Sequence, residues 1–273
     1  MLAAKGEQLM RIMQVRGLAG AWVCAAMAVL LAGCAGGAGR PDAPAKAGTL
    51  LVAGATGGTG REVVALALER GYTVRVLVRD EARARALFSD RVSYVVADVR
   101  NSAALPAAVA GAEYVISVLG SNSRREPDNK PELIDFGAVK ALAQSAQAAG
   151  VRHFVLQSSM GVTDPDHMLN KILDNVLVWK LRGEDALRAS GVPYTIVRPG
   201  GLQDGPGGSG GFKVMQGDPK VLGLTTRADV ASILVNALGR KDALGKTFEV
   251  VADPNGTPPD WNRFFRPLKP DAR

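Results

Sequence analysis

Short apolar segments alternate with amphipathic ones along most of the chain. The apolar segments predict strands at 49–53, 72–78, 92–97, 114–119, 153–157 and 194–197, and the amphipathic ones predict helices at 61–70, 103–110, 131–149 and 170–189. Glycine stands at the end of three of these helices, at Gly71, Gly150 and Gly191. Strands that alternate with helices form right-handed crossovers. The pattern therefore predicts an α/β fold, a doubly wound parallel sheet of the Rossmann type, with a small carboxy-terminal substrate-side region.

A glycine turn lies between the first predicted strand and the first predicted helix. Glycines at 54, 57 and 60 give the spacing G-x-x-G-x-x-G. Such a turn lets the backbone approach a pyrophosphate and directs the N–H groups of the helix N-terminus at it. The strand before the turn and the helix after it supply the context that the motif needs, so we expect a dinucleotide site here.

The second predicted strand ends at Arg79, where such a fold meets the adenosine ribose of its cofactor. An acidic residue at this position accepts from both ribose hydroxyls and favours NAD, whereas an arginine suits a 2′-phosphate. Arg79 thus indicates NADP(H) rather than NAD. The alternative is that Arg79, Arg83 and Arg85 form one exposed helix start.

Composition and charge exclude several classes of protein. The chain of 273 residues is 47% hydrophobic and 22% charged, which is typical of a folded globular protein. Its formal charge of +7 is scattered, with no basic run that would indicate nucleic-acid binding. The two cysteines, Cys24 and Cys34, lie near the amino terminus, which argues against a disulfide framework. No metal-ligand spacing and no phosphate-binding loop of the ATPase type occur in the sequence.

The amino terminus has the pattern of a secretory leader. Basic residues precede the apolar segment 18–32, and the residues Leu31-Ala32-Gly33-Cys34 resemble a bacterial lipobox. We expect a signal peptide at 1–33, lipid on Cys34, a flexible tether at 34–47 and one nucleotide-binding domain at 48–273. The protein would then be membrane-anchored on the periplasmic or extracytoplasmic face. A transmembrane anchor, or a mis-assigned start codon on a cytoplasmic protein, is the alternative.

Several ordered motifs resemble those of the atypical short-chain dehydrogenase/reductase superfamily. They are the turn 54–60, Asp98, Ser158-Ser159, Lys180 and the segment 194–200, and the segments 226–231 and 246–250 fit as well. The resemblance covers about residues 48–252 and is greatest for the NAD(P)H-binding group that includes NmrA-like and biliverdin-reductase-B-like proteins.

This resemblance implies a role for each matching residue. The cofactor diphosphate would contact Gly54, Thr56, Gly57, Gly58, Thr59, Gly60 and Arg61. At the adenosine end, the 2′-phosphate would contact Arg79 and the adenine Asp98 and Val99. At the nicotinamide end, the ribose and its surroundings would contact Leu119, Gly120 and Lys180, and the carboxamide would contact Pro199, Gly200, Gly201 and Leu202. Ser158, Ser159 and Lys180 would line the reaction centre.

One expected residue is missing. Most members of the superfamily use a tyrosine four residues before the lysine as acid/base, but Val176 stands there. Ser158, Ser159 and His167 are the available polar candidates, although His167 is more simply a loop residue and His153 a structural one. Lys180 could instead be a solvated lysine paired with Glu184.

These observations lead to two functional hypotheses. The first is an NADP(H)-dependent oxidoreductase that transfers hydride to a small quinone-, flavin- or enone-like acceptor, as a monomer or homodimer. The second is a non-catalytic NAD(P)H-binding redox sensor or assembly factor, which the absence of the tyrosine favours.

Overall fold

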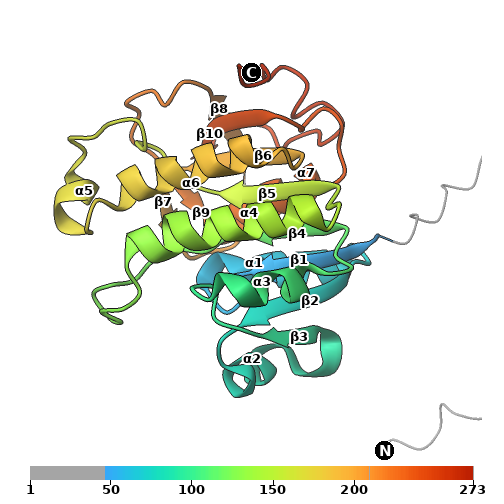
Figure 1. Ribbon diagram of the computed structural model, residues 1–273. Helices are drawn as coiled ribbons and strands as arrows, with labels where there is room; N and C mark the ends of the chain where they lie inside the picture. Colours follow the sequence, from blue (N-terminus) through green and yellow to red (C-terminus); the bar gives the residue numbers. More distant parts are fainter. Residues whose placement is uncertain (1–46, 209, 273) are drawn as a thin grey trace, which may run out of the picture. The chain divides into compact units, whose positions relative to one another are not determined.

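The computed structural model describes residues 47–208 and 210–272, and within them the main element is an eight-stranded sheet (Figure 1). The strand order is β3-β2-β1-β4-β5-β6-β10-β8. The strands are β1 (Thr49–Ala53), β2 (Thr73–Val78), β3 (Ser93–Val96), β4 (Tyr114–Ser117), β5 (His153–Gln157), β6 (Tyr194–Pro199), β8 (Gly211–Met215) and β10 (Lys246–Asp253). All neighbours pair in parallel except β8, which is antiparallel to β10. The predicted doubly wound parallel sheet is therefore confirmed.

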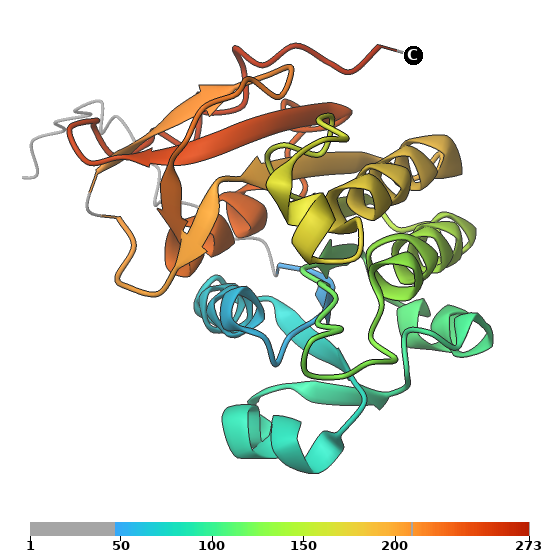
Figure 2. The same cartoon turned by 90° about the vertical axis from the view of Figure 1, so that its left-hand side faces the viewer.

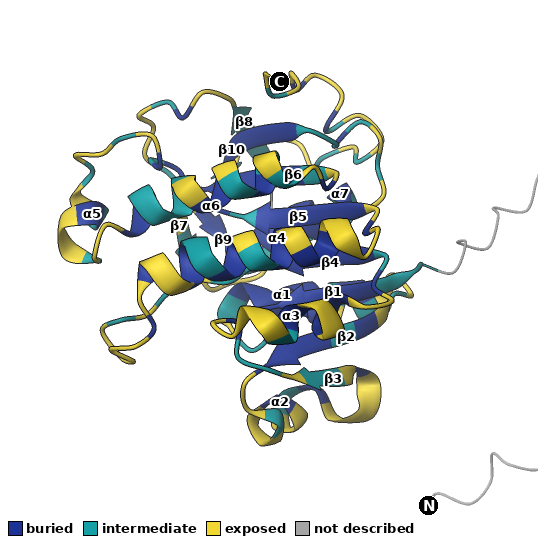
Figure 3. Cartoon of the chain, viewed as in Figure 1, coloured by how far each residue is buried: buried dark blue, intermediate teal, exposed yellow. Residues whose placement is uncertain are grey.

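Helices cover both faces of the sheet. Figures 1 and 2 show α3 (Leu105–Val109), α4 (Val139–Ala148) and α6 (Val176–Ser190) over one face, and α1 (Gly58–Glu69) and α7 (Arg227–Ala237) over the other. The helix α2 (Glu81–Phe88) follows β2, and α5 (Met168–Ile172) precedes α6. Each face has its own apolar core, made by the inward side chains of strands and helices, and the central strands between them are buried, whereas the edge strand β3 is not (Figure 3).

Three predicted helices are interrupted in the structure. The segment 103–110 is divided between a 3₁₀ turn (Ser102–Ala104) and α3, and 131–149 begins with a π-helical segment (Glu132–Ala138) before α4. The segment 170–189 breaks between α5 and α6, where Asp174 and Asn175 have φ of +50° and +57°. Residues with positive φ cannot continue a right-handed helix. Amphipathic periodicity alone does not show such local breaks.

The remaining elements lie beside the sheet on its carboxyl side. A two-stranded sheet pairs β7 (Gly201–Gln203) with β9 (Leu224–Thr226) in parallel. Thr226 caps α7, because its hydroxyl accepts the N–H of Asp229 at 3.0 Å. In the part of the chain that the structure describes, no helix combines the length and the apolar character that crossing a membrane requires. The small carboxy-terminal region, with β7 and β9, lies along the carboxyl edge of the main sheet, and this is the edge where ligands bind in such folds.

Candidate functional site

The turn between β1 and α1 depends on glycine at defined positions. Gly54 has a φ of +88°, and its carbonyl accepts the N–H of Gly57 at 3.1 Å. A Cβ on Gly60 would lie 2.2 Å from that same carbonyl oxygen. A side chain at Gly60 would therefore open the turn, as the spacing of the motif predicts.

The start of α1 provides donors and positive charge. Gly57 occupies the N-cap with no side-chain cap, and the first turn of α1 contains no acidic residue. The N–H groups and the helix dipole are thus directed at the turn without a carboxylate to oppose them. Arg227 of α7 lies beside the turn, since a Cβ on Gly58 would lie 2.5 Å from its Cδ, and its guanidinium is paired with Asp204 at 2.9 Å. Arg227 belongs to the matching segment 226–231, but the sequence pattern assigned it no role at the glycine turn, because it comes from the opposite end of the domain.

The adenosine end of the expected site carries two exposed ion pairs. Arg79 follows β2 and binds Glu126 with both guanidinium nitrogens, Nη1 to Oε2 at 2.8 Å and Nη2 to Oε1 at 3.2 Å. Asp98 follows β3 and binds Arg100 at 2.5 Å. The hydrogen bond from Arg79 lowers the pKa of Glu126. Arg79 thus already holds a carboxylate at the place assigned to the 2′-phosphate.

The nicotinamide end contains a buried ion pair. Lys180 of α6 places its Nζ 2.7 Å from Oδ1 of Asp135, with side chains 17% and 0% exposed. The other oxygen, Oδ2, accepts the N–H of Ser121 at 3.2 Å, in the loop that continues β4 past Leu119 and Gly120. The alternative pairing of Lys180 with Glu184 is wrong, because Glu184 binds Arg198 at 2.6 Å. No sequence motif marks Asp135, which lies on a π-helical segment.

Three buried polar atoms at the carboxyl ends of β4 and β5 have no hydrogen-bond partner among the described residues: Ser117 Oγ, Gln157 Oε1 and Ser158 Oγ. Ser159 differs, because its hydroxyl donates to the carbonyl of Met160 at 3.0 Å. Buried polar atoms without partners are costly, so they fit a polar ligand that completes them. A carboxamide and ribose hydroxyls are suitable groups.

A cavity of about 930 Å³ adjoins these residues. Ser159, Pro199, Gly200 and Gly201 form part of its lining, as the resemblance implies for this region. Leu202 instead packs against the core beneath α1 and α7. Much of the remaining lining is apolar, from Met160, Pro165, Leu169, Pro219, Val221, Leu222 and Leu224. The cavity has room for a bulky planar molecule beside the nicotinamide position.

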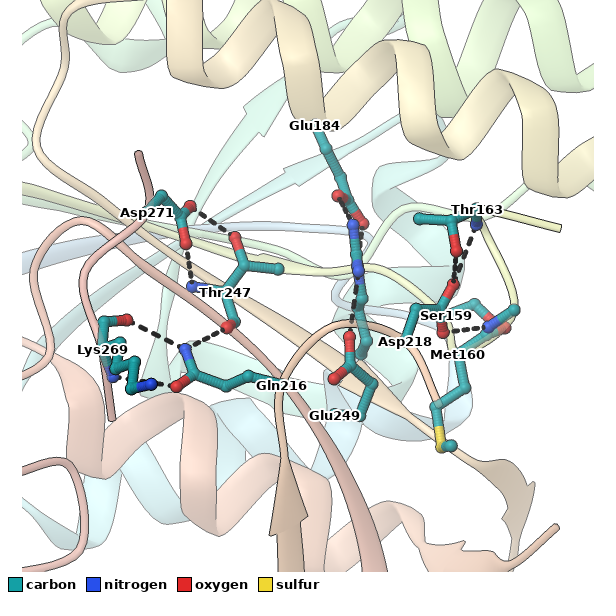
Figure 4. Close-up of polar contacts among 12 residues, drawn as sticks. Ser159, Met160, Thr163, Glu184, Gln216, Asp218, Thr247, Glu249, Lys269 and Asp271 are labelled. Carbon is teal, nitrogen blue, oxygen red and sulfur yellow. Dashed lines mark hydrogen bonds and ion pairs between the residues drawn. The ribbon is translucent and has the colours of Figure 1, made fainter. Parts of the chain in front are cut away.

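Asp218 joins the two walls of this cavity (Figure 4). Its carboxylate accepts the N–H of Gly161 at 2.6 Å and both the N–H and the hydroxyl of Thr163 at 2.8 Å. One buried side chain thus ties the segment 216–224 to the segment 160–163, and Gln216 ties its start to Thr247 and Lys269. No sequence motif marks Asp218.

A buried charge network lies behind the cavity, where Figure 4 labels Glu184 and Glu249. Arg198 connects them, with Nη2 2.6 Å from Glu184 and Nη1 2.9 Å from Glu249. Burial lowers the pKa of Arg198, but the hydrogen bonds and charges of the two glutamates raise it overall. Arg198 thus stays charged and connects α6, β6 and β10.

The two histidines have different surroundings. His153 is buried, binds Thr195 Oγ1 at 2.9 Å and accepts the N–H of Gly239, and burial lowers its pKa to about 4. It is structural, as expected. His167 lines the cavity, but its Nδ1 accepts the N–H of Leu169 at 3.1 Å and so caps α5. It is half-buried in the loop before α5, so the expected loop position is only part of its role.

Some predictions concern residues 1–46, which lie outside the described part of the chain. These are the signal peptide at 1–33, lipidation of Cys34 and nearly all of the tether. Within 47–208 and 210–272, no group of three or more His, Cys, Asp or Glu side chains is arranged to hold a metal ion. The site is thus built from glycines, hydroxyls and ion pairs.

Comparisons with known proteins agree with this geometry. A family model described as NAD(P)H-binding matches residues 54–241. An uncharacterised chloroplastic protein of Arabidopsis thaliana is 35% identical over 77% of this chain and 71% of its own length. Sanguinarine reductase of Eschscholzia californica is 42% identical, over 46% of this chain and 48% of its own length. A solved structure of the NAD-dependent epimerase/dehydratase type from Bacillus halodurans has a TM-score of 0.68 and 29% identity, covering 77% of this chain and 95% of that one.

Proposed function

The chain belongs to the NAD(P)H-binding oxidoreductase family within the atypical, NmrA-like short-chain dehydrogenases/reductases, and on this premise we propose that it is an NADP(H)-dependent reductase of conjugated acceptors. One observation carries the proposal: the glycine turn and the start of α1, whose first turn has no acidic residue, lie at the same sheet edge as the 930 Å³ cavity. A dinucleotide on the turn would extend along this edge, and its nicotinamide would lie next to the cavity.

The residues present fit such a cofactor. The turn 54–60 would hold the diphosphate through backbone N–H groups, and Arg79 the 2′-phosphate. Lys180 would donate to the nicotinamide ribose. The unpartnered oxygens of Ser117, Gln157 and Ser158 would gain partners from the ribose and carboxamide. Arg79 favours NADP(H) over NAD(H), because a bidentate guanidinium matches a phosphate better than two neutral hydroxyls.

The cavity supports a bulky acceptor with a planar conjugated system, of the quinone, flavin or enone kind. Apolar side chains from the segments 160–169 and 219–224 would cover its faces. When bound, the reduced nicotinamide supplies a hydride to the acceptor. The protein would orient the acceptor and exclude water from its faces, and a proton from solvent, or relayed through Ser159, would complete the reduction. Val176 in place of tyrosine suits acceptors whose product anion is already stabilised by conjugation.

The test is a turnover assay of the full chain with NADPH and a panel of acceptors: a benzoquinone, a naphthoquinone, a free flavin and an enone. Oxidation of NADPH is followed by its near-ultraviolet absorbance. We expect turnover with at least one acceptor and its loss in Gly60→Ala, where the added Cβ meets the Gly54 carbonyl. Tight NADPH binding without oxidation across the panel would instead favour a non-catalytic cofactor-binding sensor or assembly factor. The valine at 176 is the observation in favour of that second function.

The place of action is a separate proposal. The leader pattern at 1–33 supports export and lipidation of Cys34, with residues 34–47 as a tether to the membrane surface. Mass spectrometry of the mature amino terminus tests it. A diacylglycerol-modified Cys34 at the new terminus is the expected result, and an unprocessed Met1 or Met13 start would overturn it.

A further inference from the structure

Asp135 is a buried carboxylate that joins three separate parts of the site. Its side chain is fully buried, and its oxygens contact Lys180 Nζ at 2.7 Å and the Ser121 N–H at 3.2 Å. Lys180 comes from α6 and Ser121 from the loop after β4. One carboxylate therefore fixes two groups that both lie at the nicotinamide end of the sheet edge.

Local structure places Asp135 inward. It lies in the π-helical segment Glu132–Ala138, whose wider turn changes the direction of its side chains relative to those of α4. Gly183 of α6 makes the approach possible, because a Cβ there would lie 2.2 Å from the Asp135 carbonyl oxygen. Phe136 also stacks on Trp179 with ring centroids 6.0 Å apart. The contact between the π segment and α6 is thus built around this ion pair.

Stability does not account for such a pair. Two charges lose their hydration when buried, and apolar residues of similar size often stabilise a protein as well or better. A lysine side chain is long and flexible, however, and a buried partner restricts it to one geometry. The pair is therefore better suited to placing the ammonium group than to holding the fold together.

We propose that Asp135 is a positioning residue for the cofactor: one oxygen holds the Lys180 ammonium so that its remaining hydrogens face the nicotinamide ribose, and the other fixes the loop after β4 by accepting the Ser121 N–H. This inference rests on the proposed function. It also explains how the site differs from that of tyrosine-dependent relatives. There, the charge of the lysine helps to lower the pKa of the tyrosine. Here Val176 has no proton to exchange, and Asp135 balances the charge of Lys180. Lys180 then acts as a hydrogen-bond donor and not as a source of positive potential.

A double-mutant cycle tests the proposal, with NADPH and NADH affinities measured by calorimetry on the full chain. Asp135→Asn should weaken both cofactors by about tenfold or more, because the nicotinamide ribose is common to them. Asp135→Asn should add little when Lys180→Met is already present, since it acts through the lysine. The double variant leaves no lone buried charge and keeps the test usable if a single variant unfolds. Glu132→Gln, an exposed carboxylate of the same π segment, is the matched control and should bind normally.

A labelling experiment gives a second readout that does not depend on the cofactor. Acetic anhydride should modify Lys180 slowly in the unaltered chain and faster in Asp135→Asn, with exposed Lys171 as the internal reference. Unchanged cofactor affinity in Asp135→Asn, or losses that add fully to those of Lys180→Met, would overturn the proposal. If the unaltered chain binds neither cofactor while Lys180 is protected by Asp135, the proposed function fails and the pair is structural.

Discussion

Two ion pairs lie at opposite ends of the proposed cofactor-binding edge, and they differ in their contact with water. Arg79 and Glu126 are 44% and 47% exposed, whereas Lys180 and Asp135 are 17% and 0% exposed. Solvent screens the first pair, so either partner can be replaced by another charged group at little cost in free energy. The second pair is desolvated, so removing either partner leaves a costly lone charge. The adenosine end is thus suited to selecting a ligand and the nicotinamide end to fixing its geometry.

The largest expected difference between the two pairs is in stability. Lys180→Met leaves Asp135 buried without its counter-charge and should lower the free energy of unfolding by about 3–5 kcal/mol. Arg79→Met should lower it by less than about 1 kcal/mol, because the exposed pair contributes little. Urea denaturation followed by circular dichroism measures both. Equal small losses would mean that the pair at Lys180 is effectively hydrated.

The next effect concerns cofactor choice. Arg79→Glu should raise the Kd for NADPH roughly 100-fold, through a lost bidentate contact and added repulsion, and change that for NADH by less than about threefold. Titration calorimetry with each cofactor gives the comparison. If both affinities fall equally, Arg79 does not read the 2′-phosphate.

Glu126 should have a smaller effect of opposite sign. The Glu126 carboxylate accepts hydrogen bonds from the Arg79 guanidinium and would compete there with the 2′-phosphate. Glu126→Gln should therefore tighten NADPH binding by about three- to tenfold and leave the affinity for NADH unchanged. The matched control is Glu113→Gln, which removes an equally exposed carboxylate, 2.8 Å from Arg152, at the amino ends of β4 and β5. A similar gain in the control would point to net charge as the cause.

The smallest effect is a titration shift. The hydrogen bond from Arg79 holds the pKa of Glu126 below its usual value of 4.5, so the pair persists above that pH and is lost as the pH falls through the lowered pKa. Carboxyl NMR should detect this midpoint, and Arg79→Gln should return it to the usual value. The thermal midpoint should hardly follow this titration. A large loss of stability over that range would show that the pair is less hydrated than its exposure indicates.

The regular part of the fold was predictable, because apolar strands, glycine stops and the turn at 54–60 are local patterns. The turn geometry at Gly54 and Gly60 follows directly from the motif. The ion-pair partners were not predictable, since Asp135 and Glu126 approach their partners only through tertiary structure. The helix break at Asp174 and Asn175 also escaped prediction, because both residue types occur within helices as well as in left-handed turns.

The contacts of Asp218 bear on how the choice of acceptor could change in variants of this protein. The wall of the cavity formed by 216–224 is fastened through contacts with Gly161 and Thr163, at a distance from the glycine turn along the chain. Residues 219–222 can therefore be replaced as a cassette while Asp218 keeps its anchorage, whereas Gly223 must stay, because its carbonyl accepts the Gly201 N–H at 2.9 Å and a Cβ there would lie 2.6 Å from Val251. A library of variants confined to that cassette would change which acceptor binds in the cavity and leave the cofactor-binding residues unaltered.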